Sequence, residues 1–323
     1  MLCWSGEIRV GAGSLRHAIG LHPSVRLYAS IRRGMIADTE LDIPYRGPVN
    51  DQLTLYALLS GDLWLRDPTV HVRGPALILL PQPIVDGANG KRTRTYTNYG
   101  EPLTLCEVTL AAKHWRGPAH SGDPREVLVL EHDDALVSAL NQASLDFLAN
   151  DPQLSRAGAH AILDAVISRG LVDPELRGAP TLIKSSVERL WMAFAPVLRS
   201  PVLPSLDELA ERMHVSARQV QRTLARLTTA VGLPPELHFR DLTLMWRLRL
   251  AVRLLSIEDA PSSLIARRLG YSDSNALARA LTHAGLGGLA ELREQLLARH
   301  RQLREAAAII ADVPSPAPST PIP

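Results

Sequence analysis

One short pattern occurs twice in the last third of the chain, and it limits the possible folds more than any other feature. Small or apolar residues fill three positions at offsets zero, three and five, which are Ala210, Met213 and Val215 and, about 56 residues later, Ala266, Leu269 and Tyr271. A segment with helical periodicity follows each copy, from Ser216 and from Ser272. Two helices joined by a tight turn, repeated in this way, predict a duplicated helix-turn-helix unit over Leu206–Arg293.

The helix expected after Ser216 has an apolar side and a basic side, and Ser216 is itself a favoured N-cap residue. At about 100° per residue, the inward positions are Ala217, Val220, Leu224 and Leu227, and the outward positions are Arg218, Arg222 and Arg226 with Gln219 and Gln221 beside them. Arginines four residues apart repel one another, and no acidic residue four positions away offsets this. This basic side of the helix is either simply exposed to solvent or binds a polyanion. Because arginine can read guanine and glutamine can read adenine, and because a tight turn precedes the helix, we expect DNA.

The second unit repeats this arrangement with less charge. Its inward positions are Leu277, Leu281 and Ala284, and its outward positions are Asn275, Arg279 and His283. We expect Arg279 to contact DNA and His283 to be an ordinary surface residue. Between the units, Asp241–Leu255 predicts a connecting helix about 22 Å long, which suits two recognition helices in successive major grooves about 34 Å apart. Its arginines at positions 247, 249 and 253 either contact phosphate or keep the helix soluble.

This stretch resembles the DNA-binding domain of the AraC/XylS family of transcriptional regulators. The matching residues are Ser216, Arg218, Val220, Arg222 and Leu224, then Arg247, Leu248, Ala251, Leu254 and Leu255, then Ile265, Ala266, Leu269, Gly270, Tyr271, Ser272 and Asp273, and finally Arg279 and Arg293. The resemblance implies base and backbone contacts at Arg218, Gln221 and Arg222 and at Ser274, Asn275 and Arg279. Together with the flanking Gln219 and Arg226, these are the candidate DNA-binding residues.

The sequence also departs from the family's pattern in the second unit. Ala276, Leu277 and Leu281 stand where the family has aromatic residues, and Leu286–Leu289 replaces its Gly-x-Ser-Pro segment. The stretch from Gly232 to Arg247 is about four residues longer than usual. We therefore expect the second unit to pack less well or to make mainly nonspecific contacts, and the first unit to read DNA.

The first half of the chain is rich in short β-type runs. We expect an irregular segment up to about residue 24, followed by strands at Val25–Ile31, Leu53–Leu59, Leu63–Arg66, Thr69–Val72, Ala76–Leu80, Arg92–Tyr99 and Leu103–Leu110, with a hairpin turn at Gly61-Asp62. This spacing is typical of a small barrel or sandwich. The family resemblance implies a cupin-like barrel that senses a small molecule or forms a dimer.

Helical patterns follow the strands. They cover Asp133–Ala149, Asp151–Ser168 and Thr181–Leu198, with a proline-containing linker at Arg199–Pro204, a final helix to about Ala311 and a disordered tail from Pro314. The sequence predicts an α+β multidomain chain with a β-rich sensory domain (1–125), a helical connecting or dimerisation region (126–200), a double helix-turn-helix domain (201–312) and a tail (313–323).

Composition and motifs exclude several other classes. The net charge is only +2, so any basic footprint is local, and the two cysteines, Cys3 and Cys106, form no disulfide framework. We expect no secretory signal, no membrane span and a cytoplasmic protein. No nucleophile elbow, Walker loop or dinucleotide motif occurs. The scattered histidines at positions 71, 114, 120 and 132 do not form a metal motif, and we assign no catalytic residue, cofactor or metal.

The expected function is a ligand-responsive, sequence-specific transcriptional regulator that reads double-stranded DNA with two recognition helices. Its expected partners are DNA, RNA polymerase, an unidentified small-molecule effector and a second copy of the chain in a homodimer. Aromatic residues that either line the effector pocket or belong to an ordinary core are Tyr56, Trp64, Tyr96, Tyr99 and Trp115. The alternatives are a cupin-like small-molecule binder or enzyme with a degenerate helical domain, and a chain whose helices around residues 130–198 serve assembly alone.

Overall fold

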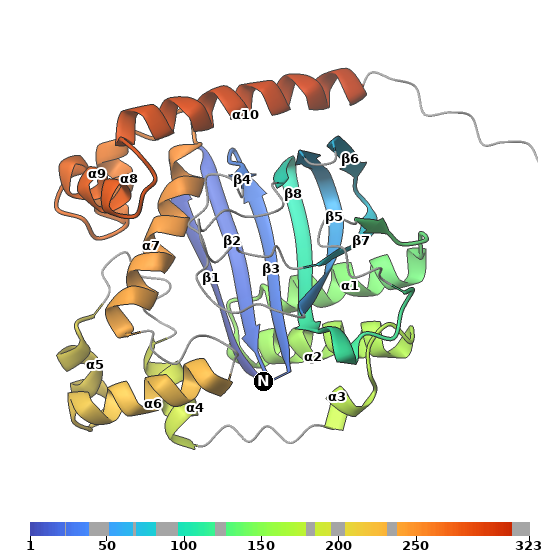
Figure 1. The fold of residues 1–323 in the computed structure, drawn as a ribbon, viewed down its shortest axis with the longest axis horizontal. Helices are drawn as coiled ribbons and strands as arrows, with labels where there is room; N and C mark the ends of the chain where they lie inside the picture. The colour runs from blue at the N-terminus through green and yellow to red at the C-terminus, as the bar shows by residue number, and fades with distance from the viewer. Residues whose placement is uncertain are drawn as a thin grey trace, which may run out of the picture.

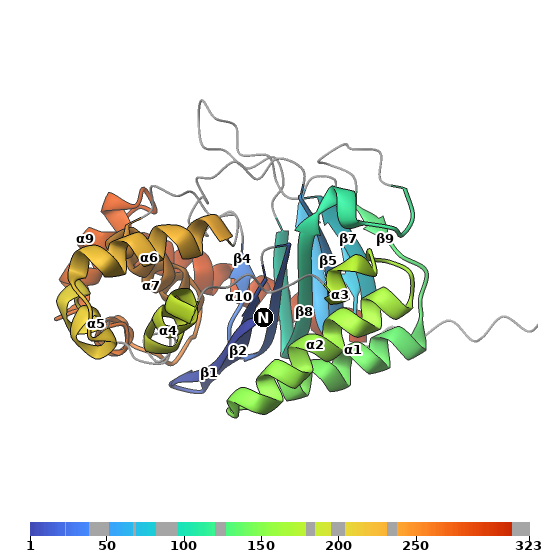
Figure 2. The same cartoon turned by 90° about the horizontal axis from the view of Figure 1, so that it is seen from below.

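A computed structural model describes residues 1–22, 24–38, 52–66, 69–81, 96–119, 127–178, 185–194, 204–230 and 238–311. An antiparallel sheet forms the N-terminal half, two helices lie against one of its faces, and the C-terminal helices lie beside its first strands (Figures 1 and 2). The predicted order of a β-rich part followed by a helical part is confirmed. No helix among these residues is both long enough and apolar enough to cross a membrane.

The chain begins with a β-hairpin, so the prediction of an irregular N-terminal segment is wrong. β1 (Leu2–Val10) pairs along its whole length with β2 (Gly13–Leu21). Gly11 makes the turn between them at a φ of +56°, which favours glycine. Ile8 and Val10 are buried and alternate with exposed residues, which is the period of two that a strand requires. The glycines at positions 11, 13 and 20 suggest irregular structure, but the alternation of buried and exposed residues indicates a strand.

The sheet is open, which corrects the expected barrel. Its main strand order is β1-β2-β3-β8-β5-β7-β9, with β4 paired to β8 and β6 paired to β5. The bounds are β3 (Val25–Arg33), β4 (Ala37–Asp38), β5 (Gln52–Arg66), β6 (Thr69–Arg73), β7 (Ala76–Pro81), β8 (Tyr96–Ala111) and β9 (Leu128–Val129). β1 and β9 are the two ends of this order and do not pair. The apolar residues of β1 pack against C-terminal helices instead.

β5 is one long strand, so the predicted hairpin at Gly61-Asp62 is wrong. The pairing of β5 with β8 continues from Gln52 to Leu65, with register shifts between Leu58 and Asp62 that mark a β-bulge. Gly61 has a φ of +94°, and a Cβ there would lie 2.7 Å from a Cδ1 atom of Leu103. The glycine therefore serves a close approach of two strands rather than a chain reversal. The two strands predicted at 92–99 and 103–110 likewise belong to one β8, and residues 92–95 lie outside the described part.

Helices α1 (Asp134–Phe147) and α2 (Pro152–Ser168) confirm the first two predicted helices. The side chain of Asp133 accepts a hydrogen bond from the backbone N–H of Leu136, and Asp151 caps α2 in the same way. The pair covers one face of the sheet (Figure 2) and completes a core that includes Leu27, Leu55, Val108, Leu140, Phe147, Ile162 and Val166. A 3-10 turn, η1 (Ala112–His114), and α3 (Glu175–Gly178) join this layer to the sheet.

The remaining helices form the C-terminal region. They are α4 (Ser185–Phe194), α5 (Leu206–Met213), α6 (Ala217–Ala230), α7 (Phe239–Leu255), α8 (Ser262–Arg268), α9 (Ser274–His283) and α10 (Leu289–Ala311). α7 runs beside β1 and β2, and α10 passes across the ends of the strands (Figure 1). α4 lies within the predicted helix Thr181–Leu198, whose ends, with the predicted linker up to residue 203 and the predicted tail, lie outside the described residues.

Candidate nucleic-acid interface

The two repeated turns begin with the same backbone structure. In the first, the N–H of Val215 donates to the carbonyl of Ala210 at 3.1 Å, and in the second the N–H of Tyr271 donates to that of Ala266 at 2.9 Å. The residue before each donor is left-handed: His214 has a φ of +54° and Gly270 a φ of +76°. This bond pattern ends a helix at a left-handed residue and starts a tight turn. The equal offsets in the sequence therefore reflect equal geometry up to Val215 and Tyr271. The second turn then runs one residue longer, because α6 begins at Ala217 and α9 at Ser274.

The first unit positions α6 through side-chain caps at both of its helices. Ser205 and Glu208 form a capping box at the start of α5, with hydrogen bonds of 3.1 and 2.6 Å. The hydroxyl of Ser216 accepts from the N–H of Gln219 at 3.2 Å at the start of α6. The predicted inward residues Val220, Leu224 and Leu227 are buried. α6 is thus fixed against α5 along its apolar side.

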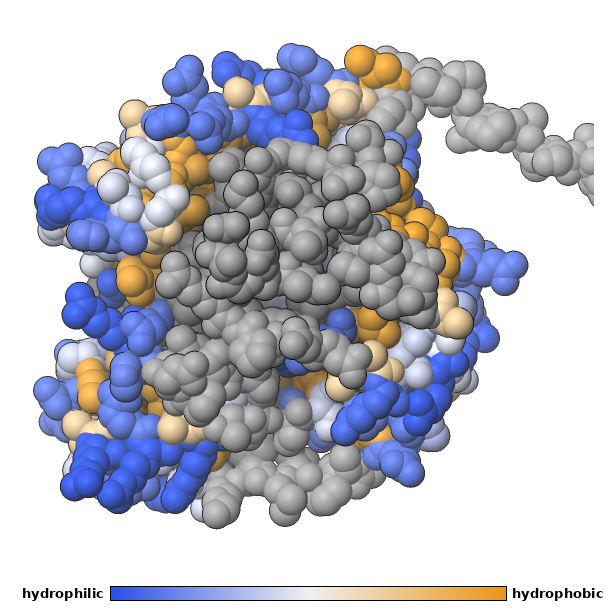
Figure 3. Space-filling view, viewed as in Figure 1, coloured by the Kyte–Doolittle hydropathy of each residue, from blue (hydrophilic) through white to orange (hydrophobic). Residues whose placement is uncertain are grey.

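The predicted DNA-facing residues of α6 lie on its outer side. Arg218, Arg222 and Arg226 are exposed, and Gln219 and Gln221 are half-buried beside them. The amide of Gln219 lies 3.5 Å from the hydroxyl of Thr223, on the same helix. Figure 3 shows hydrophilic side chains over α5 and α6, at the lower left of the molecule. The three guanidinium groups share one accessible helix face.

The second unit is packed as completely as the first, although the family's aromatic residues are replaced. Leu277 and Leu281 are fully buried in a core formed with α7 and α10. Asp273 caps α9 by accepting from the N–H of Ala276 at 2.8 Å, and this bond with that from the Ser272 hydroxyl lowers the pKa of the Asp273 carboxyl. Of the candidate residues, Ser274 is half-buried, while Asn275, Arg279 and the neighbouring His283 are exposed. Of the two expectations for the second unit, loose packing is therefore wrong, and mainly nonspecific contacts with DNA stay a prediction.

Two arginines of α7, Arg247 and Arg253, have partners within the protein. Arg247 lies over the ring of Tyr271 at 5.6 Å, and burial lowers the pKa of its guanidinium. Arg253 points into the sheet, where it donates to the hydroxyl of Tyr28 at 3.2 Å. Arg293, which belongs to the family resemblance, donates to the backbone carbonyls of Ile257 and Glu258 at 3.3 Å. Arg247 and Arg253 are therefore engaged within the protein, which differs from a purely solubilising role. Phosphate contact by the arginines of α7 stays a prediction.

A buried polar cluster lies on the face of the sheet opposite α1 and α2, and sequence reasoning missed it. Arg32 is 1% exposed and donates to the side-chain carbonyl of Asn98 at 2.6 Å. Asn98 in turn donates to the hydroxyl of Tyr56 at 2.8 Å. The Nε of Arg32 has no hydrogen-bond partner in the described part of the chain. A buried guanidinium with an unpaired donor is costly and calls for an anion or water at the site.

His17 extends this cluster toward α7. Both of its ring nitrogens are buried without a partner among the described residues. Burial, with the positive charges of Arg253 and Arg32, lowers the pKa of His17 to about 3. Burial raises the pKa of the Tyr28 hydroxyl, but the same two guanidinium groups outweigh it and leave that pKa below its ordinary value. Glu107, which pairs opposite both Tyr28 and Tyr56 in the sheet, adds a negative charge that acts to raise the pKa of both hydroxyls. The cluster thus combines two guanidinium groups with one carboxylate.

The alternation in β3 is the signal that identifies this cluster. Val25, Leu27 and Ala29 face the α1–α2 core, so the alternate residues Tyr28 and Arg32 must face the other side. Sequence alone does not show that this second side is also covered. The structure shows that it is, because Arg32 and Tyr56 are both buried.

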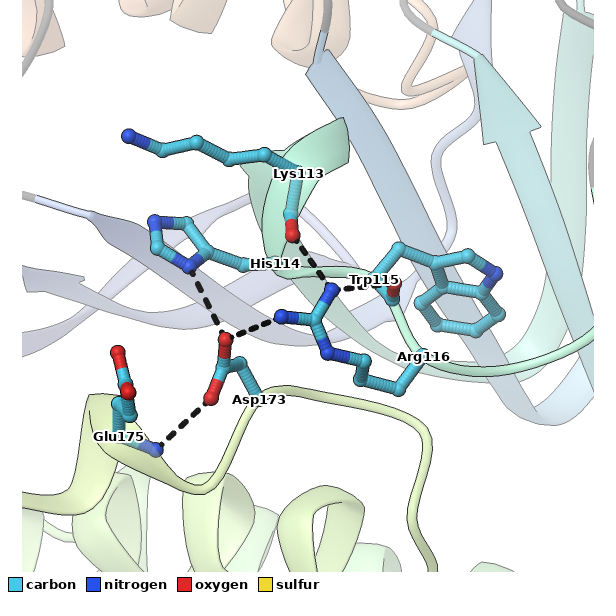
Figure 4. Close-up of polar contacts among 6 residues, drawn as sticks. All are labelled: Lys113, His114, Trp115, Arg116, Asp173 and Glu175. Atoms are coloured by element: carbon cyan, nitrogen blue, oxygen red, sulfur yellow. Dashed lines mark hydrogen bonds and ion pairs between the residues drawn. The ribbon is translucent and has the colours of Figure 1, made fainter.

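A second charged group, shown in Figure 4, joins η1 to the segment before α3. Arg116 donates from Nη2 to a carboxylate oxygen of Asp173 at 2.6 Å, and the Nδ1 of His114 lies 3.9 Å from the same oxygen. The other carboxylate oxygen accepts from the N–H of Glu175 at 3.0 Å. This backbone bond, followed by the charges of Arg116 and His114, lowers the pKa of Asp173. Each group is engaged in holding two chain segments together, which indicates a structural role.

The described residues contain no group of three or more histidine, cysteine or acidic side chains placed to hold a metal ion. His71 lies 2.8 Å from a carboxylate oxygen of Asp62 and stacks on Trp64 with 4.8 Å between ring centroids. His120 lies outside the described residues. Tyr56 belongs to the polar cluster, whereas Trp115 is part of the core against α1 and α2.

Comparison with known proteins gives weak structural likenesses. No protein-family model and no curated protein matches the sequence. ToxT from Vibrio cholerae O395 is 11% identical with a TM-score of 0.34, over 85% of this chain and 98% of that one. Unsaturated fatty acid bound ToxT from Vibrio cholerae is 10% identical with a TM-score of 0.33, over 85% and 96%. The AraC-like transcriptional activator CuxR is 12% identical with a TM-score of 0.23, over 92% and 82%.

Proposed function

We propose that this chain is a DNA-binding transcriptional regulator of the AraC type, in which α6 and α9 are the recognition helices. The observation that carries this proposal is the exposed row of Arg218, Arg222 and Arg226 on a helix that directly follows a tight turn. Such a helix fits the major groove. Phosphate groups offset the repulsion between arginines, and guanine edges give them bidentate partners. The exposed Asn275 and Arg279 give α9 a smaller set of similar contacts.

Selection of bound fragments from genomic DNA tests this proposal, followed by mobility shift on the selected sites at moderate salt. We expect Arg218→Ala/Arg222→Ala to abolish the specific complex, because each bidentate arginine–guanine contact contributes about 1–3 kcal/mol. Arg73→Ala/Arg301→Ala is the matched control, since it removes the same charge from exposed positions on β6 and α10. Equal binding by the two double variants would contradict the assignment.

We propose further that the sheet half is the sensory part of the regulator and that a small organic anion is its effector. The support is the cluster of Arg32 and Arg253, whose two positive charges lie near Tyr28 and the neutral His17 and outnumber the single carboxylate of Glu107. The Nε of Arg32, which has no partner among the residues that the structure describes, gives an anion a buried donor. Charge-assisted bonds of this kind are about twice as strong as neutral ones. Aromatic rings of Tyr28 and Trp246 around His17 provide an apolar wall.

Thermal-shift measurements with acetate, hexanoate, benzoate and inorganic phosphate test the effector proposal. A ligand at 100 times its Kd stabilises the folded chain by about 2.7 kcal/mol, which raises Tm measurably. Arg32→Gln should remove the shift caused by the best anion, and Arg73→Gln should retain it. A shift of equal size in both variants would place the anion elsewhere.

A further inference from the structure

The turn that joins α7 to α8, Ser256–Asp259, is bonded from two sides. From the sheet, the N–H of Ala12 donates to a carboxylate oxygen of Asp259 at 2.8 Å. The N–H of Ile36 donates to the hydroxyl of Ser256 at 3.0 Å, and that bond is buried. Ala12 is in the β1–β2 turn and Ile36 precedes β4, so two separate segments of the sheet half hold this one turn.

α10 holds the same turn from the other side. The Nδ1 of His300 donates to the carbonyl of Ser256 at 2.8 Å, and His300 is buried. Arg293 donates to the carbonyls of Ile257 and Glu258, and Arg304 lies 3.3 Å from the carboxylate of Glu258. The turn is therefore the point at which the sheet, α7, α8 and α10 are bonded together.

The β1–β2 turn and the α7–α8 turn are too closely packed to admit an additional side-chain atom. A Cβ at Gly13 would lie 2.4 Å from a Cδ1 atom of Ile257, which is itself 1% exposed. A Cβ at Gly11 would lie 2.6 Å from a carboxylate oxygen of Asp259. The β1–β2 turn thus fits against the α7–α8 turn only because two of its residues lack side chains.

The first helix-turn-helix unit meets the sheet differently. Its core contains Leu2 and Trp4 of β1 together with apolar residues of α4 and of α7. The indole N–H of Trp191 on α4 donates to the carbonyl of Cys3 at 3.0 Å. This contact is mainly apolar packing, which is less directional than the hydrogen bonds at Ser256–Asp259.

We propose that Ser256–Asp259 is a latch through which the sheet controls the order of the second helix-turn-helix unit, α8–α9, and not that of the first. The polar cluster of the sheet connects to it directly, since Arg253 bonds Tyr28 and its own carbonyl accepts from the hydroxyl of Ser256 at 2.6 Å. An anion bound in the polar cluster would shift Arg253 and with it α7. Because Ser256 bonds to the carbonyl of Arg253, the shift would move the turn Ser256–Asp259 that precedes α8. This inference rests on the proposed function and assigns the control of DNA binding to the turn Ser256–Asp259.

Hydrogen–deuterium exchange on the full chain tests the latch without DNA. Asp259→Ala removes the acceptor of the Ala12 N–H, and Glu305→Ala removes an exposed carboxylate of α10 as the matched control. We expect about tenfold faster exchange in α8–α9 for Asp259→Ala, on the order of one lost charge-assisted hydrogen bond. α5–α6 should exchange at the wild-type rate, and Glu305→Ala should match wild type throughout. Gly13→Ala, which forces the two turns apart, should reproduce the Asp259→Ala pattern.

Unchanged exchange in α8–α9, or equal acceleration in α5–α6, would overturn the latch. If Gly13→Ala does not fold, Asp259→Ala still decides the outcome, because Asp259 is exposed and its change leaves the core intact. DNA affinity gives a separate readout: we expect Asp259→Ala to bind about threefold more weakly, since α9 must then be ordered on binding. A wild-type chain that binds no DNA would contradict the proposed function, while the exchange comparison would still decide the latch.

Discussion

The imidazole of His17 on β2 stacks on the indole of Trp246 on α7, with ring centroids 5.4 Å apart and an angle of 8° between the planes. The edge of Trp4 meets the same imidazole, with 4.9 Å between centroids. One aromatic group therefore contains residues from the sheet and from the helix that connects the two helix-turn-helix units. The two halves of the chain share a core at this point.

Replacing His17 with phenylalanine should stabilise the protein. The imidazole is buried with both nitrogens unpaired among the described residues, and leaving a buried polar group unsatisfied costs about 1–3 kcal/mol. Phenylalanine keeps an aromatic ring against Trp246 without that cost. Urea unfolding at pH 7 should show about 1 kcal/mol of added stability for His17→Phe, whereas His17→Ala should lose stability through the cavity it leaves. Stabilisation by both variants, or by neither, would contradict this account.

The same residue predicts how stability depends on pH. Burial and two nearby arginines lower the pKa of folded His17 to about 3 from an ordinary value of 6.5. The unfolded chain therefore binds a proton first, so stability is complete above pH 6.5 and is lost as the pH falls toward 3. Between pH 7 and pH 5, wild type should lose about 2 kcal/mol more than His17→Phe. Parallel pH profiles for the two proteins would show that His17 does not titrate in this way.

Glycine at position 214 should stabilise the first turn. His214 has a φ of +54°, whereas the equivalent residue of the second turn is Gly270. A left-handed conformation costs a non-glycine residue roughly 1–2 kcal/mol, and the imidazole of His214 is exposed. His214→Gly should therefore raise the free energy of unfolding by about 1 kcal/mol, measured in urea. The opposite change, Gly270→Ala, serves as the control and should lower it; a loss of stability in both would refute the equivalence of the two turns.

Gly158 should tolerate no side chain, although it lies inside a helix. Alanine normally stabilises a helix by about 1 kcal/mol relative to glycine. A Cβ at Gly158, however, would lie 2.2 Å from the backbone nitrogen of Phe147 where α2 crosses α1. Gly158→Ala should destabilise the chain by about 1–3 kcal/mol in thermal or urea unfolding. Ala161→Gly, at an exposed position of the same helix, should cost only about 1 kcal/mol; a stabilised Gly158→Ala would contradict the packing.

Local patterns in the sequence predict the helical half well. Capping residues such as Ser216 and Asp133, and apolar positions at helical spacing, determine helix starts and buried faces without reference to the rest of the chain. The exposed side of α6 follows from the same periodicity, and Arg218, Arg222 and Arg226 lie on it.

Features that depend on distant segments could not be predicted. Gly61 looks like a turn residue, and only the approach of Leu103 shows that it belongs to a bulge. In the open sheet, the first strand β1 packs against C-terminal helices, a contact between distant parts of the sequence. Arg32 and Arg253 both lie close to Tyr28 but are more than 200 residues apart in the sequence. No local pattern therefore predicts that they belong to one cluster.

The affinities of Arg222→Ala and Arg279→Ala for selected DNA sites test the central claim most directly. α6 has three exposed arginines and α9 has one, so α6 should contribute more of the specific binding energy. By fluorescence anisotropy at fixed salt, we expect Arg222→Ala to raise Kd at least tenfold, and Arg279→Ala to raise it less, with Arg301→Ala as the control. Equal affinity for wild type and Arg222→Ala, or a larger loss in Arg279→Ala, would contradict the claim that the first unit reads the DNA.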